Sequence, residues 1–131
     1  MKIKAKKSLG QNFLIDQNII KKIVSTTKIN SNDSIFEIGP GTGNLSIHLI
    51  NKKPKKFFAI EKDTNLVSLL NKKFENKINI INEDILKFNI DKITKDKLIV
   101  FGNLPYNIST QILINWITND RRNPFFKKLI L

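Results

Sequence analysis

The sequence predicts an α/β fold, in which a parallel β-sheet carries α-helices on both of its faces. Short apolar runs alternate along the chain with segments of helical periodicity, and a glycine-rich loop follows the first of these runs. Strands that alternate with helices form parallel sheets with right-handed crossovers. In such sheets the ligand crevice lies at the carboxyl ends of the strands.

The first elements follow from caps and apolar spacing. Asp16 is a suitable N-cap, and the residues after it place isoleucine and valine at helical spacing up to Val24. Residues 34–38 form a short apolar run, which predicts a buried strand that enters the glycine loop at 39–43. Residues 45–50 then continue as a helix.

The later elements repeat this alternation. A second strand is expected at 57–60, a helix over 66–70, a third strand at 78–81 and a fourth at 98–101. Ile112, Leu113 and Trp116 mark the next helix, and we expect them to be core residues, not part of a ligand site. A fifth strand begins near Phe126, and the sequence ends within it.

Composition limits the class of protein. The chain has 131 residues, of which 40% are hydrophobic and 26% charged, as expected for one soluble domain with its own core. It contains no cysteine and one histidine, His48, so neither a zinc cluster nor a thiol nucleophile is predicted. No apolar run is long enough to suggest a membrane span or a secretory signal, so we expect a cytoplasmic monomer without a metal.

The net charge of +12 has two explanations. A polyanionic partner such as RNA or DNA would be attracted by it and would release counterions on binding. The positive charge is nearly all lysine, however, and the chain is also rich in asparagine and isoleucine, a combination that AT-biased codon usage produces by itself. Charge alone leaves both explanations open.

Candidate ligand-binding residues follow the predicted strands. Glycines follow the first strand and let the backbone approach a ligand closely. Glu61 ends the second strand, where an acid can accept hydrogen bonds from ribose hydroxyls. Asp84 follows the third strand and can accept from an adenine amino group, and Asn103 follows the fourth. The glycines of the loop are Gly39, Gly41 and Gly43.

A dinucleotide-binding loop is the alternative for this segment. With Gly39 and Gly41 as its first two glycines, the third should fall on Asn44, but it lies one residue earlier at Gly43. The sequence therefore disfavours a hydride-transfer enzyme.

The tetrapeptide Asn103-Leu104-Pro105-Tyr106 favours methyl transfer to the exocyclic nitrogen of adenine. That nitrogen is a poor nucleophile, and the Asn103 oxygen together with a nearby carbonyl can accept its two hydrogens. Proline stiffens the turn, and Tyr106 offers a flat face for the base. An ordinary strand-to-helix turn is the alternative when the tetrapeptide is considered alone.

Together these motifs resemble those of the ribosomal RNA adenine dimethyltransferases over nearly the whole chain. The similar segments are 7–14, 37–43, the acids Glu61 and Asp84, and 101–109. The resemblance implies a Rossmann-like S-adenosylmethionine-dependent methyltransferase fold. It also implies cofactor contacts from Asn12, Leu14, Gly39, Glu61, Asp84 and Asn103.

The activity implied by the resemblance is N6,N6-dimethylation of two adjacent adenines near the 3′ end of small-subunit ribosomal RNA, during ribosome assembly. Erythromycin-resistance methylases of large-subunit RNA share the fold and much of the motif set, but the amino-acid sequence of residues 102–109 favours the small-subunit enzymes. Lys4, Lys6 and Lys7 are expected to contact RNA phosphates, and a solvated terminus is the alternative.

A non-catalytic RNA-binding or assembly factor that keeps the methyltransferase fold is the second hypothesis. The family pattern continues with further strands and a small helical domain, both absent from these 131 residues. Residues 1–131 are therefore expected to be the N-terminal part of the methyltransferase domain. By itself this part is expected to be marginally stable and unable to dimethylate RNA.

Overall fold

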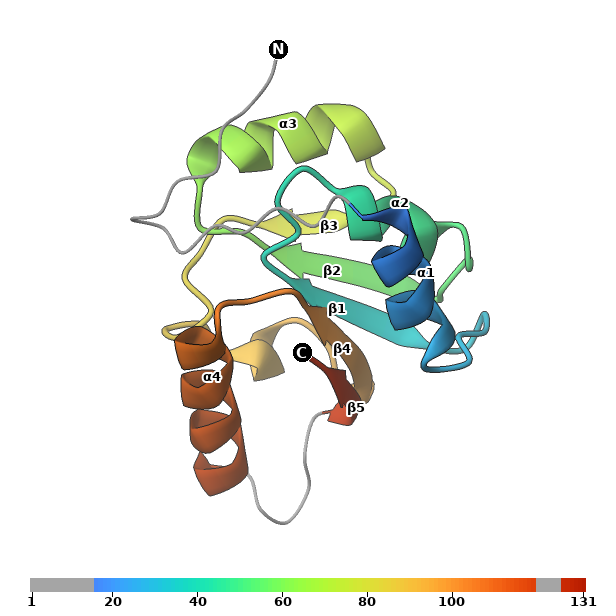
Figure 1. Cartoon of the computed structure of the whole chain (residues 1–131). Helices are drawn as coiled ribbons and strands as arrows, with labels where there is room; N and C mark the ends of the chain where they lie inside the picture. Colours follow the sequence, from blue (N-terminus) through green and yellow to red (C-terminus); the bar gives the residue numbers. More distant parts are fainter. Residues whose placement is uncertain (1–15, 120–125) are drawn as a thin grey trace.

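The computed structural model describes residues 16–119 and 126–131 and contains one five-stranded sheet (Figure 1). All strand pairings are parallel, and the strand order is β3-β2-β1-β4-β5. The strands are β1 Ser34–Ile38, β2 Lys56–Ile60, β3 Asn79–Ile81, β4 Leu98–Gly102 and β5 Phe126–Ile130. The predicted α/β fold with a parallel sheet is confirmed.

The register of the central strands brings their carboxyl ends to one edge. Ile38, the last residue of β1, pairs with Ile60 of β2 and with Gly102 of β4, which are also the last residues of their strands. Ile81 at the end of β3 pairs with Ile60. The residues that follow these four strands therefore emerge side by side.

Helices cover both faces of the sheet, as predicted. The helices α1 (Gln17–Ser25), α2 (Asn44–Ile50) and α3 (Thr64–Phe74) pack on one face. The helix α4 (Tyr106–Asn119) and a short 3-10 helix, η2 (Ile90–Lys92), pack on the other. Asp16 caps α1 by accepting from the amides of Asn18 and Ile19, which confirms the predicted helix start.

Alternate residues of each strand belong to two separate apolar cores, one on each face of the sheet. In β1, Ile35 joins the core beneath α1, α2 and α3, whereas Phe36 and Ile38 join the core beneath α4. This alternation is a consequence of the strand's two-residue period. All five residues of β1 are buried, as expected for the central strand of a sheet with both faces covered.

Two of the three residues predicted to form the core near the C-terminal end of the chain do so, whereas Leu113 is half-buried and belongs to neither core. Ile112 is fully buried, and Trp116 packs against the same core, with its ring 6.0 Å from that of Phe126. In the described part of the chain, no helix has the length and apolar character needed to cross a membrane.

The order of the strands creates a topological switch point. From β1 the chain winds outward through β2 to β3, and it then returns to place β4 on the other side of β1. The chain runs from β1 to α2 on one face of the sheet and from β4 to α4 on the other face. This divergence opens a crevice above the carboxyl ends of β1 and β4. This crevice holds the candidate site.

Candidate active site

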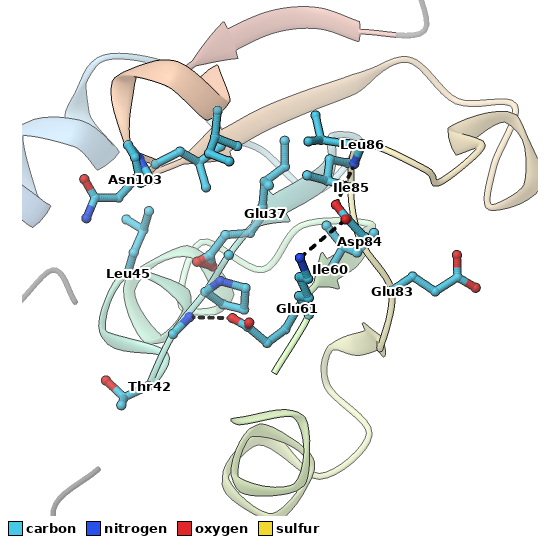
Figure 2. A pocket seen from close by; sticks show the side chains of 18 of the residues that line it. Glu37, Thr42, Leu45, Ile60, Glu61, Glu83, Asp84, Ile85, Leu86 and Asn103 are labelled. Atoms are coloured by element: carbon cyan, nitrogen blue, oxygen red, sulfur yellow. Dashed lines mark hydrogen bonds and ion pairs between the residues drawn. The ribbon is translucent and has the colours of Figure 1, made fainter. Parts of the chain in front are cut away.

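A cavity lies at the carboxyl ends of the strands, where the sequence predicts the ligand (Figure 2). Its walls come from segments that follow β1, β2, β3 and β4, which are distant in sequence. The lining residues important for its chemistry are Glu37, Gly39, Gly41, Glu61, Asp84 and Asn103.

The glycine loop between β1 and α2 forms one wall. Gly39, Gly41 and Gly43 have φ angles of 65°, 61° and 87°, a region that residues with a side chain rarely adopt. The amide of Gly39 donates to the Ile60 carbonyl at 2.9 Å, which holds the loop against the end of β2. The Lys73 ammonium group donates to the Thr42 carbonyl at 2.9 Å, so α3 also holds the loop.

Gly43 is required for a second reason. A Cβ atom built on this residue would lie 2.6 Å from Cε2 of Phe74, an aromatic ring of α3 that is buried in the core. Gly43→Ala is therefore expected to lower the free energy of unfolding by about 1–3 kcal/mol, because the new methyl group overpacks the core. Urea denaturation measures this loss.

The double variant Gly43→Ala/Phe74→Leu removes the closest contact and keeps both the contact with Leu70 and the unfavourable backbone angle. Its loss of unfolding free energy should be smaller than the sum of the losses in Gly43→Ala and Phe74→Leu. Wild-type stability of Gly43→Ala would contradict the close packing of α3 on the loop.

Glu61 is 6% exposed and fixed at the end of β2 by backbone hydrogen bonds. Its carboxylate accepts from the Gly41 amide at 3.3 Å and from the Asp63 amide at 3.0 Å. Burial raises the pKa of Glu61, although these amide donors oppose the shift. Asn82 stabilises the same turn by donating its amide to the Glu61 carbonyl at 3.0 Å, a role that the sequence did not reveal.

Asp84 forms the wall that follows β3. One carboxylate oxygen accepts from the Leu86 amide at 3.0 Å, and the other lies 3.6 Å from the ammonium nitrogen of Lys62. Both residues line the cavity. The side chains of Glu61 and Asp84, which are 23 residues apart in the chain, therefore lie around one space, as the sequence predicts for strand ends.

Glu37, the fourth residue of β1, begins the segment 37–43 that resembles the family's cofactor loop, but the sequence predicted no role for its side chain. It is 2% exposed, lines the cavity, and accepts a hydrogen bond of 2.6 Å from the Ser46 hydroxyl of α2. Burial raises the pKa of Glu37 to about 7, the Ser46 hydrogen bond opposes the rise, and the charge of Glu61 adds to it. The sequence feature that indicates a role for Glu37 is an acidic residue within an otherwise apolar strand.

The fourth wall comes from the segment after β4. Asn103, Leu104 and Pro105 line the cavity, and Figure 2 shows Asn103 across it from Asp84. A Cβ atom on Gly39 would lie 3.1 Å from Cδ2 of Leu104, so the glycine loop and this turn are in close contact. The Pro105 carbonyl accepts from two amides of the first turn of α4, both at 3.1 Å, and so begins that helix.

Tyr106 is placed differently from the rest of the tetrapeptide. It is the first residue of α4, it is 87% exposed, and it is not among the residues that line the cavity. The structure thus brings together Gly39, Gly41, Glu61, Asp84 and Asn103–Pro105, with Tyr106 on the adjacent surface. Asn12, Leu14, Lys4, Lys6 and Lys7, for which sequence predicts cofactor or RNA contacts, lie outside the described residues.

A family model described as ribosomal RNA adenine dimethylase matches residues 2–131. The chain belongs to this family.

Curated proteins of the family are similar along the whole chain. The chain is 56% identical over 131 residues to ribosomal RNA small subunit methyltransferase A of Pelagibacter ubique (strain HTCC1062), covering 100% of this chain and 50% of that protein. It is 46% identical over 123 residues to the protein of that name from Staphylococcus haemolyticus (strain JCSC1435), covering 88% and 41%. The chain thus spans about half the length of the curated relatives it matches.

Solved structures of rRNA and adenosine methyltransferases share the fold. A dimethyladenosine transferase from Plasmodium falciparum superposes with a TM-score of 0.73 at 30% identity, covering 88% of this chain and 41% of that one. The 23S rRNA methyltransferase ErmE superposes with a TM-score of 0.70 at 25% identity, covering 82% and 43%. These matches confirm the Rossmann-like methyltransferase fold.

Proposed function

We propose that the protein uses S-adenosylmethionine to methylate N6 of two adjacent adenines near the 3′ end of small-subunit ribosomal RNA during ribosome assembly. The placement of Asn103–Pro105 in the same cavity as the glycine loop and the two acids carries this proposal. The relatives from Pelagibacter and Staphylococcus are named as methyltransferases of the small subunit, which favours that RNA over the large-subunit RNA on which ErmE acts.

The residues of the cavity fit this cofactor. The Glu61 carboxylate accepts from the backbone amides of Gly41 and Asp63, and it has further lone pairs that a ribose hydroxyl could use. Asp84 is an acceptor suited to the adenine amino group, and the positive-φ glycines present backbone in place of side chains. Asn12 and Leu14 are proposed to contribute further contacts.

When bound, S-adenosylmethionine supplies a methyl group that its sulfonium has already activated. The protein's task is then to align the adenine nitrogen with that methyl group. The Asn103 side-chain oxygen and the Leu104 carbonyl would accept the two amino hydrogens, which localises the nitrogen lone pair. The target adenine must leave its stack to reach the cavity, and the exposed ring of Tyr106 would receive it.

Lys4, Lys6 and Lys7 are proposed to contact RNA phosphates. The second hypothesis, a non-catalytic RNA-binding or assembly factor, gains no support from the named relatives, which are methyltransferases.

A methylation assay separates the two hypotheses. The protein expressed from its complete reading frame is incubated with small ribosomal subunits that lack the adenine methyl groups and with methyl-labelled S-adenosylmethionine. The proposal predicts label in N6,N6-dimethyladenosine at two adjacent positions. Binding of the subunit without transfer of label would favour the non-catalytic factor.

The cofactor contacts are tested by substitution of the two acids. Glu61→Ala and Asp84→Ala should each weaken S-adenosylmethionine binding by about 1–3 kcal/mol, because each removes a hydrogen-bonding carboxylate. Isothermal titration calorimetry measures both affinities. Glu75→Ala is the matched control, since it removes an exposed glutamate that does not line the cavity. Wild-type affinity in both acid variants would remove Glu61 and Asp84 from the cofactor site.

A further inference from the structure

A groove lies on the outer surface of the sheet's helical layer, between the C-terminal half of α1 and the C-terminal end of α2 (Figure 1). Beneath it, Ile20 and Val24 of α1 share a buried core with Leu45 and Leu49 of α2, which holds the two helices together. Its lining contains no acidic residue and is mostly polar. The residues of this α1–α2 groove are Lys21, Val24, Ser25, His48, Asn51 and Lys52.

The cations of the groove are available to a ligand. Lys21 and Lys52 are exposed, and within residues 16–119 and 126–131 their ammonium groups form no ion pair and no hydrogen bond. The Nε2 atom of His48 lies 3.0 Å from Oε1 of Gln17, which joins α2 to α1 beside the groove. The walls are therefore fixed to each other, whereas the two lysine side chains have no described partner.

Lysines near helix C-termini also interact favourably with the helix dipole, so a structural explanation has to be considered. The last carbonyls of α1 and α2 already have donors, however. The Ser25 hydroxyl donates to the Lys22 carbonyl at 2.9 Å, and the Lys52 amide donates to the Leu49 carbonyl at 3.1 Å. The ammonium groups of the groove are thus not needed to cap these helices.

The segments that form this face lack acidic residues. Residues 61–96 contain lysine at a similar frequency, but there the acids are as numerous as the lysines. Codon usage accounts for lysine in both parts of the chain, but it does not account for acids being absent from one of them. The acid-free segments are residues 17–32 and 44–53, with lysine at positions 21, 22, 28, 52 and 53.

The two acids that flank these segments do not neutralise the groove. Asp16 lies at the opposite end of α1, where its carboxylate accepts from the first amides of the helix. Asp33 is buried and forms an ion pair with Lys127 of β5. The positive charge beside the groove is therefore uncompensated by either of them, which favours an anionic ligand.

The helix α2 connects the groove to the cavity. Asn44 and Leu45, at the start of α2, line the cavity, whereas Asn51 and Lys52, just after its end, line the groove. Because a helix rises 1.5 Å per residue, about 10 Å separates the two sites along α2. A few nucleotides of one RNA strand span such a distance.

We propose that the α1–α2 groove binds backbone phosphates of the ribosomal RNA and holds the RNA while a target adenine occupies the cavity. This inference rests on the proposed RNA substrate. Lys21 and Lys52 supply ammonium groups and Asn51 an amide, all of which bind phosphate oxygens. Such contacts fix the position of the RNA and carry no sequence information. The selection of the adenine stays with the cavity.

Neutralising the two lysines of the groove tests this proposal. Lys21→Gln/Lys52→Gln, in the protein expressed from its complete reading frame, should bind small ribosomal subunits that lack the adenine methyl groups on the order of tenfold more weakly at about 0.15 M salt. The slope of log affinity against log salt should become shallower by somewhat under two units, because each lost phosphate contact removes about one unit. Filter binding over a series of salt concentrations measures both quantities.

Two further pairs of substitutions control for net charge and for packing. Lys72→Gln/Lys77→Gln removes the same charge from exposed lysines that do not line the groove, and its affinity should stay close to that of the wild type. Lys21→Arg/Lys52→Arg keeps both charges and should also bind like the wild type. Equal losses in the two glutamine pairs would show that only net charge matters and would overturn the proposal. An unchanged affinity and slope in Lys21→Gln/Lys52→Gln would overturn it as well.

An anionic membrane is the other polyanion that such a surface could bind. Ile19 and Ile47 are exposed on the same two helices, but neither lines the groove. Vesicles that contain phosphatidylserine serve as the probe. Vesicle binding that depends on Lys21 and Lys52, together with subunit binding that does not, would assign the groove to lipid and overturn the proposal.

Failure of the proposed function has a different signature. The groove residues do not line the cavity, so Lys21→Gln/Lys52→Gln should keep the affinity for S-adenosylmethionine and the kcat of methylation, while KM for the subunit rises. A wild-type protein that transfers no label would contradict the proposed function, and the subunit affinities would still decide the role of the groove. Methylation by the wild type with an unchanged KM in the variant would overturn the groove proposal alone.

Discussion

Replacing Asn103 by alanine is expected to lower the rate of adenine methylation by roughly 100-fold or more, as when one aligned polar group of a catalytic site is removed. Asn103 lies at the end of β4 and lines the cavity across from Glu61 and Asp84. Its side-chain oxygen is proposed to accept an amino hydrogen of the target adenine. Without it, the nitrogen lone pair is neither localised nor aimed at the methyl group.

Initial rates of label transfer to unmethylated small subunits, at saturating cofactor, measure this effect. Asn107→Ala is the matched control, because Asn107 is an exposed asparagine, the second residue of α4, that does not line the cavity. We expect its rate to stay close to that of the wild type. A rate for Asn103→Ala close to that of the wild type would remove Asn103 from the catalytic group.

Tyr106→Ala is expected to give the second-largest loss of methylation. Stacking of a base on an aromatic ring is worth about 1–3 kcal/mol, which corresponds to a loss of roughly 5-fold to 150-fold in rate. Because Tyr106 is 87% exposed and does not line the cavity, stability and cofactor affinity should change little. The variant therefore separates base binding from folding and from cofactor binding.

Two further variants sharpen the test of Tyr106. Tyr106→Phe keeps the ring and should retain most of the activity. Ile114→Ala removes another exposed apolar side chain from α4, 56% exposed in the structure, and should leave methylation unchanged. If Tyr106→Ala and Ile114→Ala methylate equally well, the exposed ring is not the platform for the base.

The sheet could be predicted from the sequence because its strands are local signals. Each strand is a short apolar run bounded by polar residues, and residues 34–38 match β1 at both ends. The prediction was less accurate where the signal is weak. The strand predicted at 78–81 includes Ile78, which is buried but precedes β3. The short helix η2 was not predicted, because it begins at a side-chain hydrogen bond in which Asn89 accepts from the Asp91 amide.

The site could be predicted only in part, for a related reason. Residues that follow parallel strands meet at one edge, so the positions of Glu61, Asp84 and Asn103 followed from the strands alone. The pairs that hold the site in place are not local. Glu37 meets Ser46, and Lys62 meets Asp84, only after the crossovers have formed. The separation of the two partners along the chain matches no helix or strand repeat in either pair, so the sequence pattern does not indicate these contacts.

The switch point between β1 and β4 divides the site into two halves that come from separate parts of the sequence. The first half consists of the cavity residues at the ends of β1, β2 and β3, all before residue 90. The second half is the turn after β4, which follows residue 102 and is proposed to bind the base. The halves touch where Leu104 packs beside Gly39. A side chain at position 39 would therefore press on Leu104 and shift the turn at 103–105 away from the glycine loop.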